Sequence, residues 1–232
     1  MTAFQTTRWS LILATREPGA EAATALNDLC RNYRPAVLSY LRRRCGDRDR
    51  AEDLTQGFFA RFLEHRYHEI ADPARGRFRV FLGTALRNYL ASRAEHDFAA
   101  KRGGGMAAME LDEERVAGAS RDSPEHAFDL AWALAVLDQA MAALEAEAVA
   151  NGKGPMFARL REFLTENPDP ADYAQAATEL GMRQNTLAVS VHRIRERLRD
   201  KVREVLADTV QDPAEIDDEL RTLRKVLGSV GG

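Results

Sequence analysis

Residues 171–199 read ADYAQAATELGMRQNTLAVSVHRIRERLR, and this stretch decides the class of fold. Apolar side chains recur at steps of three and four on both sides of Gly181, as expected of two amphipathic helices. Ala176 and Ala177 are small enough to let two helices cross closely, and glycine readily adopts the backbone conformation of a tight turn. The stretch therefore predicts two helices joined by a short turn, a helix-turn-helix.

The second of these helices has two chemically different faces. Its predicted core face consists of Leu187, Val191, Ile194, Leu198 and Val202. Its opposite face carries Arg183, Gln184, Asn185, Thr186, Ser190, Arg193 and Arg197. When such a helix enters a DNA groove, its N-terminal side chains meet base edges and its basic side chains meet phosphates. We predict base contacts from Gln184 and Asn185 and phosphate contacts from Arg193 and Arg197. An ordinary helical hairpin with a solvated basic face is the alternative.

The rest of the chain also has the periodicity of helices. Runs of alternating β-branched residues are missing, so we predict an all-α fold. Further helices are expected at about 3–15, 21–45, 49–65, 77–101, 125–149, 156–165 and 214–227. Pro35 should bend or break the second of these. The Gly- and acid-rich stretch 103–124 predicts a flexible linker between two helical domains, 1–102 and 125–210, with a C-terminal extension at 211–232.

Composition excludes several classes of protein. Hydrophobic residues make up 45% of the chain and charged residues 30%, which is typical of a soluble globular protein. No apolar run reaches the roughly 20 residues that span a bilayer, and the N-terminus lacks the pattern of a signal peptide. Cys30 and Cys45 show no metal-binding or redox spacing. We therefore predict a cytoplasmic protein with reduced thiols.

The net charge of −3 conceals a strong asymmetry along the chain. Lys and Arg outnumber Asp and Glu by seven to two in residues 75–102, and again by seven to two in residues 182–203. Residues 103–181 carry five basic and fifteen acidic side chains. Two basic blocks separated by an acidic one favour two contacts with a polyanion, because basic side chains neutralise phosphates. Two solvated Arg-rich helices would give the same count.

Three motifs, in this order, resemble extracytoplasmic-function sigma factors of bacterial RNA polymerase. Residues 50–63, RAEDLTQGFFARFL, look like the polymerase-binding motif of region 2, usually DAEDLxQExF. Residues 78–90, FRVFLGTALRNYL, are similar to the helix that melts the −10 element. Residues 173–182 and 186–198, YAQAATELGM and TLAVSVHRIRERL, resemble region 4, which reads the −35 element. The resemblance covers about residues 21–103 and 125–205.

The resemblance implies a role for each block. Core polymerase would be bound through its clamp and flap, with Glu52, Asp53 and Gln56 at the clamp contact. Promoter DNA would be contacted in the first domain by Arg79, Arg87, Asn88, Arg93, Lys101 and Arg102. Phe78, Phe81 and Tyr89 are available to hold unpaired bases, although we favour core packing for Phe78 and Phe81.

The polymerase-binding motif departs from the family pattern at two acidic positions. Arg50 and Gly57 stand where the family usually has acids, so the face is depleted of negative charge. Helical spacing predicts that Thr55 lies on this face with Glu52 and Gln56. A phosphate on Thr55 would restore negative charge, and some branches of the family are controlled by kinases rather than by anti-sigma factors. Activation by a Ser/Thr kinase at Thr55 is therefore a hypothesis, with an anti-sigma factor as the other possible regulator.

Other functions find little support in the sequence. His65 and His68 are three residues apart, whereas the zinc motif HExxH needs a spacing of four, so we interpret them as exposed residues at a helix end. No phosphate-binding loop or nucleophile elbow is present. We predict no catalytic centre, no cofactor and no metal site. A dimeric helix-turn-helix regulator is the remaining alternative, but it would not need the motif at 50–63. The helix at 214–227 would either pack on the second domain or regulate it, and we favour packing.

Overall fold

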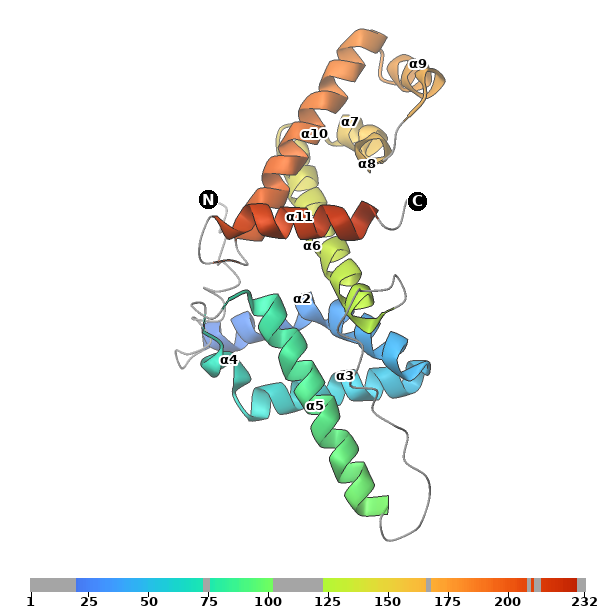
Figure 1. Cartoon of the computed structure of the whole chain (residues 1–232). Helices are drawn as coiled ribbons and strands as arrows, with labels where there is room; N and C mark the ends of the chain where they lie inside the picture. The colour runs from blue at the N-terminus through green and yellow to red at the C-terminus, as the bar shows by residue number, and fades with distance from the viewer. Residues whose placement is uncertain are drawn as a thin grey trace. The chain divides into compact units, whose positions relative to one another are not determined.

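In the computed structural model, the described residues are 20–72, 76–101, 123–165, 168–207, 210 and 214–228. They are helical, with no strand among them, which confirms the all-α prediction. The helices, labelled in Figure 1, are α2 (Ala20–Cys45), α3 (Arg48–Glu64), α4 (Tyr67–Ile70), α5 (Phe78–Lys101), α6 (Pro124–Ala150), α7 (Gly154–Leu160), α8 (Glu162–Thr165), α9 (Pro170–Glu179), α10 (Gln184–Ala207) and α11 (Glu215–Gly228). The helix expected at 3–15 and most of the expected linker lie outside the described residues.

The predicted helix bounds agree with the observed ones to within two residues for most of the described helices. Two details differ. Pro35 does not break α2: it lies on the exposed side of the helix, between the buried Tyr33 and Val37, and the helix continues to Cys45. The single helix expected at 156–165 is two short helices, α7 and α8, that are separated at Arg161.

The described helices belong to two compact units. The first contains residues up to Ala135 together with residues from Ala207 onward, and the second contains Val136–Leu206. The helix α6 begins in the first unit and ends in the second.

The core of the first unit is built from α2, α3 and α5. Helices α2 and α3 form a hairpin, and the Asp47 side chain caps α3 by accepting a hydrogen bond from the backbone N–H of Arg50. Helix α5 crosses this pair (Figure 1). Aromatic rings join the three helices through edge-on contacts. The ring centres of Tyr33 and Phe78 are 5.2 Å apart, and those of Phe58 and Tyr89 are 5.7 Å apart. Phe78 is fully buried, which confirms its predicted place in the core.

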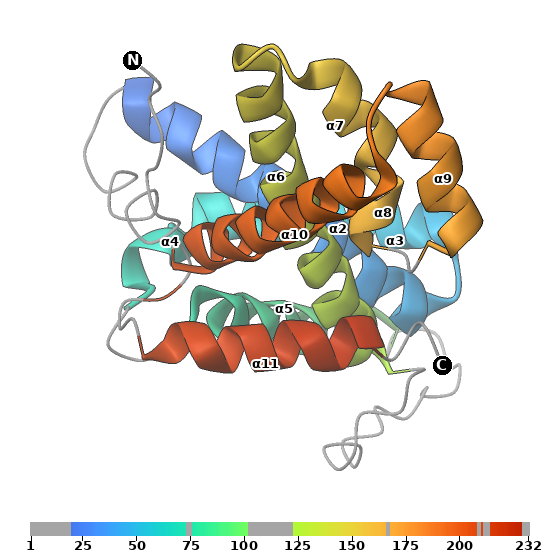
Figure 2. The same cartoon turned by 90° about the horizontal axis from the view of Figure 1, so that it is seen from above.

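Two further segments complete the first unit. The start of α6 is tied to α2 by the Tyr40 hydroxyl, which lies 3.3 Å from Oε1 of Glu125. Helix α11, labelled in Figure 2, buries Leu220, Leu223 and Val226. The expected packing of this C-terminal helix on the second domain is therefore wrong, because α11 belongs to the first unit.

We expect the phenol of Tyr40 to ionise only near pH 12. Burial, followed by the neighbouring Glu125 carboxylate, raises the pKa of Tyr40 from 10.0 to about 12. A folded-state pKa above the unfolded value means that the neutral phenol stabilises the fold below about pH 10, and that this stabilisation is lost as the pH rises through about 12. An absorbance titration of tyrosinate should lose its most alkaline step in Tyr40→Phe. A variant that titrates in the same way as the wild type would contradict the assignment.

The second unit surrounds a small core. Its buried members are Leu160, Phe163, Ala176, Ala177, Leu187 and Val191. Helix α9 starts with a capping box between Asp169 and Asp172, each side chain accepting from the backbone of the other residue. Gly181, with a φ of +61°, forms the turn into α10. The two helices joined by a short turn are therefore present, and Ala176 and Ala177 are buried as predicted.

Candidate functional site

The N-terminal part of α10 presents a row of polar side chains to solvent. The exposed members are Arg183, Gln184, Asn185, Thr186 and Arg193, and Ser190 between them is half-buried. Leu187 and Val191 point the other way and are buried, because positions three and four apart share one side of a helix. Gln184 donates from Nε2 to the Pro170 carbonyl at 3.2 Å, and Ser190 donates from Oγ to the Thr186 carbonyl at 2.9 Å. The predicted face is therefore assembled, with two of its side chains also bonded locally.

Farther along α10, the basic side chains have partners inside the second unit. Arg197 and Lys201 both bind Glu147 of α6, with Lys201 Nζ 2.8 Å from Oε1. The hydrogen bond from Lys201, with the Arg197 charge beside it, lowers the pKa of Glu147. Arg197, a predicted phosphate contact, is therefore already paired with Glu147 within the second unit. Arg195 donates from Nε and Nη2 to the Phe163 carbonyl at 2.9 and 2.6 Å, a positioning role that the sequence did not indicate.

A second basic row follows α5. Arg87, Asn88 and Arg93 are exposed, as their predicted role in DNA contact requires. Arg87 donates to Thr84 Oγ1 at 3.0 Å, and Arg93 donates to the Tyr89 hydroxyl at 3.5 Å. These are local contacts along one helix, so both guanidinium groups stay on the surface. The side chain of Lys101 and the whole of Arg102, the remaining predicted contacts at this end, lie outside the described residues.

Arg79 was predicted to project from the same helix, and this prediction is wrong for the structure described here. Only 11% of its side chain is exposed. It is paired with Asp129 at 2.5 Å and with Glu219 at 3.3 Å, and its guanidinium lies 4.7 Å from the centre of the Trp132 ring. The partners come from α6 and α11, far away in the sequence. Local helical spacing could not reveal them.

The α3 face predicted to bind polymerase retains two exposed polar side chains, Asp53 and Gln56. The third, Glu52, is held by two arginines of α2, with Arg34 at 2.5 Å and Arg42 at 3.3 Å. Arg42 and Arg34 are each about half exposed, so the network is open to solvent. Glu52 therefore reaches the surface with its charge already partly neutralised, which depletes this face of negative charge further than the sequence indicated.

Thr55 does not lie on that face, and the prediction that it does is wrong. Its exposed fraction is 0%, and its hydroxyl donates to the Ala51 carbonyl at 2.7 Å. The buried stripe of α3 consists of Ala51, Thr55, Phe58 and Phe62, whereas Leu54 is only half-buried. The steps of four, three and four fit a core stripe well. Because threonine is polar, Thr55 was assigned to the exposed face. Its helical spacing from Ala51 and Phe58 would have predicted that it is buried.

Gly57 departs from the family pattern for a reason visible in the packing. A Cβ atom at this position would lie 2.5 Å from the Tyr89 hydroxyl oxygen and 3.8 Å from Arg93 Nη1. A larger residue would require the Tyr89 hydroxyl to move away from this position. The glycine thus allows a close approach between α3 and the side chains of Tyr89 and Arg93 on α5.

The histidines provide no metal site in the described part of the chain, where no group of three His, Cys, Asp or Glu side chains is placed to hold an ion. His65 is exposed, as expected. His68 is not, because its ring is buried beside Phe62 with 6.3 Å between ring centres. The expectation of exposure is therefore wrong for His68, which belongs to the core.

Residues 29–95 match the family model of sigma-70 region 2. The matched segment runs from the middle of α2 through α3 and α4 to the exposed arginines of α5. It contains both the motif predicted to bind polymerase and the second basic row. The match supports a sigma-70 family factor. No curated protein and no solved structure matches the chain significantly.

Helix α6, which follows region 2, is long and apolar enough to cross a membrane by length and composition. In its most apolar window, 39% of the residues are buried within the structure. Trp132, Val136 and Ala140 are among the buried residues of this helix. Core helices of soluble proteins pass the same test of length and composition.

Proposed function

We propose that the chain is a sigma factor of the extracytoplasmic-function type, which binds core RNA polymerase and directs it to promoters. The region 2 match carries the proposal. Asp53 and Gln56 on the exposed side of α3 would meet the polymerase clamp, and Arg87, Asn88 and Arg93 on α5 would meet the −10 element. A depleted α3 face predicts weak clamp binding, because charge complementarity raises association rates and specificity.

The second unit would read the −35 element as region 4 and contact the polymerase flap. This part of the proposal is supported by the α9–α10 pair, by its short turn at Gly181, and by the exposed polar row at the start of α10. In such a pair the first turn of the second helix reaches base edges in the major groove. Asn185 and Thr186, which are exposed there, are the strongest candidates for base contacts.

Run-off transcription with purified core polymerase tests the proposal. Promoter-dependent transcripts should appear only when chain and core are both present, and the two should co-elute in gel filtration. Template fragments enriched with the chain from genomic DNA supply the promoters. If the chain instead binds duplex DNA alone as a dimer with symmetric half-sites and never co-elutes with core, it is a stand-alone regulator and the proposal is wrong.

Arg193→Ala should weaken promoter binding by the assembled holoenzyme nearly equally for different −35 sequences. A lost phosphate contact reduces the slope of log affinity against log salt by about 1, whereas a lost base contact changes sequence preference. Arg199→Ala is the matched control, since this exposed arginine lies about 120° around the helix from Arg193. Filter binding across a salt series gives both slopes. Equal slopes for the two variants would show that Arg193 does not contact a DNA phosphate.

A further inference from the structure

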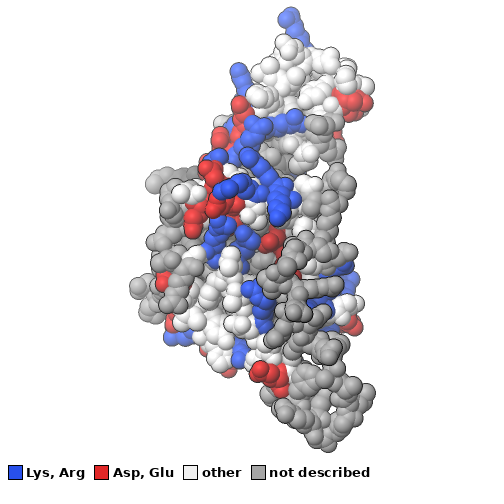
Figure 3. Space-filling model, viewed as in Figure 1, with Lys and Arg blue, Asp and Glu red and all other residues white. Residues whose placement is uncertain are grey.

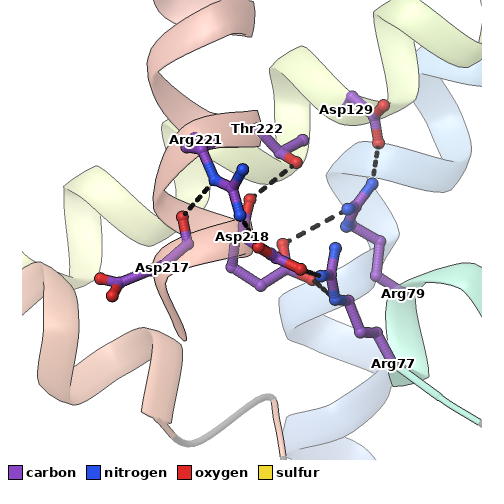
Figure 4. Close-up of polar contacts among 8 residues, drawn as sticks. Arg77, Arg79, Asp129, Asp217, Asp218, Arg221 and Thr222 are labelled. Atoms are coloured by element: carbon purple, nitrogen blue, oxygen red, sulfur yellow. Dashed lines mark hydrogen bonds and ion pairs between the residues drawn. The ribbon is translucent and has the colours of Figure 1, made fainter. Parts of the chain in front are cut away.

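The start of α5 carries two arginines that are neutralised by acids from elsewhere in the first unit. Arg77 lies 3.1 Å from Asp218 and 3.1 Å from Glu219, both on α11. Arg79 is shared between Glu219 and Asp129, at the distances given above. Figure 4 shows the two guanidinium groups and the carboxylates converging, with Asp218 also accepting from Arg221. The acids paired with Arg77 and Arg79 in this cluster, Asp129, Asp218 and Glu219, all lie outside residues 29–95.

Glu219 occupies a place where an apolar residue would pack well. It is 1% exposed and lies on the same buried side of α11 as Leu220, Leu223 and Val226. Burial raises the pKa of Glu219 even with two guanidinium groups beside it. Buried ion pairs are often no more stabilising than apolar side chains of the same volume. The acid is therefore poorly explained as a device for stability, and its charge calls for another explanation.

Arg79 is not saturated by the two acids that bind it. A guanidinium has five N–H donors, and Nε of Arg79 is buried with no hydrogen-bond partner among the described residues. The guanidinium carbon lies over the Trp132 ring, which limits how far the group can turn. A ligand with several oxygens around one centre would fit this fork better than two carboxylates from separate helices.

The cluster lies within the matched domain at the beginning of its basic helix. Arg77 and Arg79 fall inside residues 29–95, and α5 continues with the exposed Arg87 and Arg93. Asp218 and Glu219 lie outside the match, in the C-terminal extension. In the view of Figure 1, acidic and basic side chains are intermixed around the position of α11 (Figure 3). The extension thus removes two cations from the row that region 2 would otherwise present.

We propose that Arg77 and Arg79 form a binding site for nucleic-acid phosphate, and that Asp218 and Glu219 of α11 occupy this site in the free chain as stand-ins for phosphate oxygens. The inference rests on the proposed function, because it assigns promoter DNA as the displacing ligand. The acids lie in the first turns of α11, while Leu223 and Val226 anchor its later turns. Displacement therefore needs only the beginning of the helix to move. The free chain binds DNA weakly, and it binds strongly only when polymerase holds promoter DNA against region 2.

The test compares two double variants with the same change in charge. D218N/E219Q removes the two carboxylates that contact the arginines. E215Q/D217N removes two carboxylates from the same end of α11, and the Asp217 carboxylate points away from Arg77 and Arg79 (Figure 4). Both chains are titrated without polymerase into a fluorescent oligonucleotide, as duplex and as single strand. Far-UV circular dichroism and thermal melting check that each chain is folded.

We expect D218N/E219Q to bind on the order of tenfold more tightly at low salt, with a salt slope steeper by about 2, one unit for each released arginine. The control should change by less than about twofold. Adding R77A/R79A should abolish the gain. Equal gains in both double variants would show a general charge effect and overturn the proposal, and so would no gain in either.

A second measurement uses the wild-type chain, and so tests the proposal even if the variants do not fold. In the wild-type chain, hydrogen exchange at residues 215–222 should accelerate when promoter DNA binds to the holoenzyme, and unchanged exchange would overturn the proposal. The two proposals also fail separately. If the chain never co-elutes with polymerase but D218N/E219Q still gains DNA affinity through Arg77 and Arg79, the sigma-factor assignment fails while the phosphate site stands.

Discussion

Thr55→Glu is expected to destabilise region 2 by at least about 3 kcal/mol, because it places an unpaired carboxylate in the core. Thr55 is fully buried and its hydroxyl donates to the Ala51 carbonyl, which is an acceptor and could not bond to a carboxylate. A loss of this size is a large part of the total stability of a small domain. Urea denaturation followed by circular dichroism should show the loss as a lower midpoint.

Two variants control for the expected effect of Thr55→Glu. Gln56→Glu adds the same charge one position along on the exposed side of α3, and should change stability by less than about 0.5 kcal/mol. Thr55→Val keeps the shape of the side chain and loses one hydroxyl bond, at a cost of about 1 kcal/mol. If Thr55→Glu is as stable as Gln56→Glu, the buried position of Thr55 is wrong.

The same burial bears on control by phosphorylation. A kinase needs its target hydroxyl in an extended, accessible segment, whereas the Thr55 hydroxyl is inside a helix and in the core. We expect the folded chain to remain unmodified at Thr55 in a kinase reaction followed by mass spectrometry. A loss of polymerase binding in Thr55→Glu would then report unfolding, and not the effect of a phosphate. Stoichiometric phosphate on Thr55 in the folded chain would restore the kinase hypothesis.

Gly57→Glu, which places the family's usual acid at this position, is expected to cost about 2–3 kcal/mol of stability. The first side-chain atom would lie 2.5 Å from the Tyr89 hydroxyl oxygen, and overpacking a core contact costs about 1–3 kcal/mol. Gly57→Ala should also be destabilising, although alanine in a helix normally gains about 1 kcal/mol over glycine. Thermal and urea unfolding give both values.

In a chain that also carries Tyr89→Phe, Gly57→Ala should increase stability where it lowers it in the wild type. Without the hydroxyl, the nearest tyrosine atom to a Cβ at position 57 is Cζ at 3.6 Å, an ordinary contact. Gly57→Ala should then stabilise the Tyr89→Phe chain by about 0.5–1 kcal/mol. Gly83→Ala, in an open part of α5 with Arg87 Nη1 as the nearest atom at 4.0 Å, should stabilise the wild-type chain. A Gly57→Ala chain that is more stable than wild type would remove the steric account of this glycine.

Gly57 and Glu52 also bear on the low negative charge of the exposed side of α3. An acid at position 57 would clash with the Tyr89 hydroxyl unless that side chain moved. Glu52 keeps its charge but shares it with Arg34 and Arg42. Under the proposed function, such a face is expected to bind a basic clamp weakly, because it offers little negative charge to complement the clamp.

The sequence by itself determined the helices and the two chemically different faces of α10. Both depend on residues three and four positions apart in the chain, and this spacing can be read directly from the sequence. The bounds of α3, α5 and α10, the turn at Gly181 and the buried alanines before it could all be predicted in this way. The exposed row at the start of α10 could be predicted for the same reason.

Only the tertiary structure decided which charged and polar side chains remain available. Arg79 looks like a surface arginine from its own helix, but its partner Glu219 is 140 residues away. Thr55 looks like a surface residue until the helices that cover it are in place. Burial and ion pairing depend on segments distant in the chain, and local periodicity holds no information about which segment will lie opposite a given side chain.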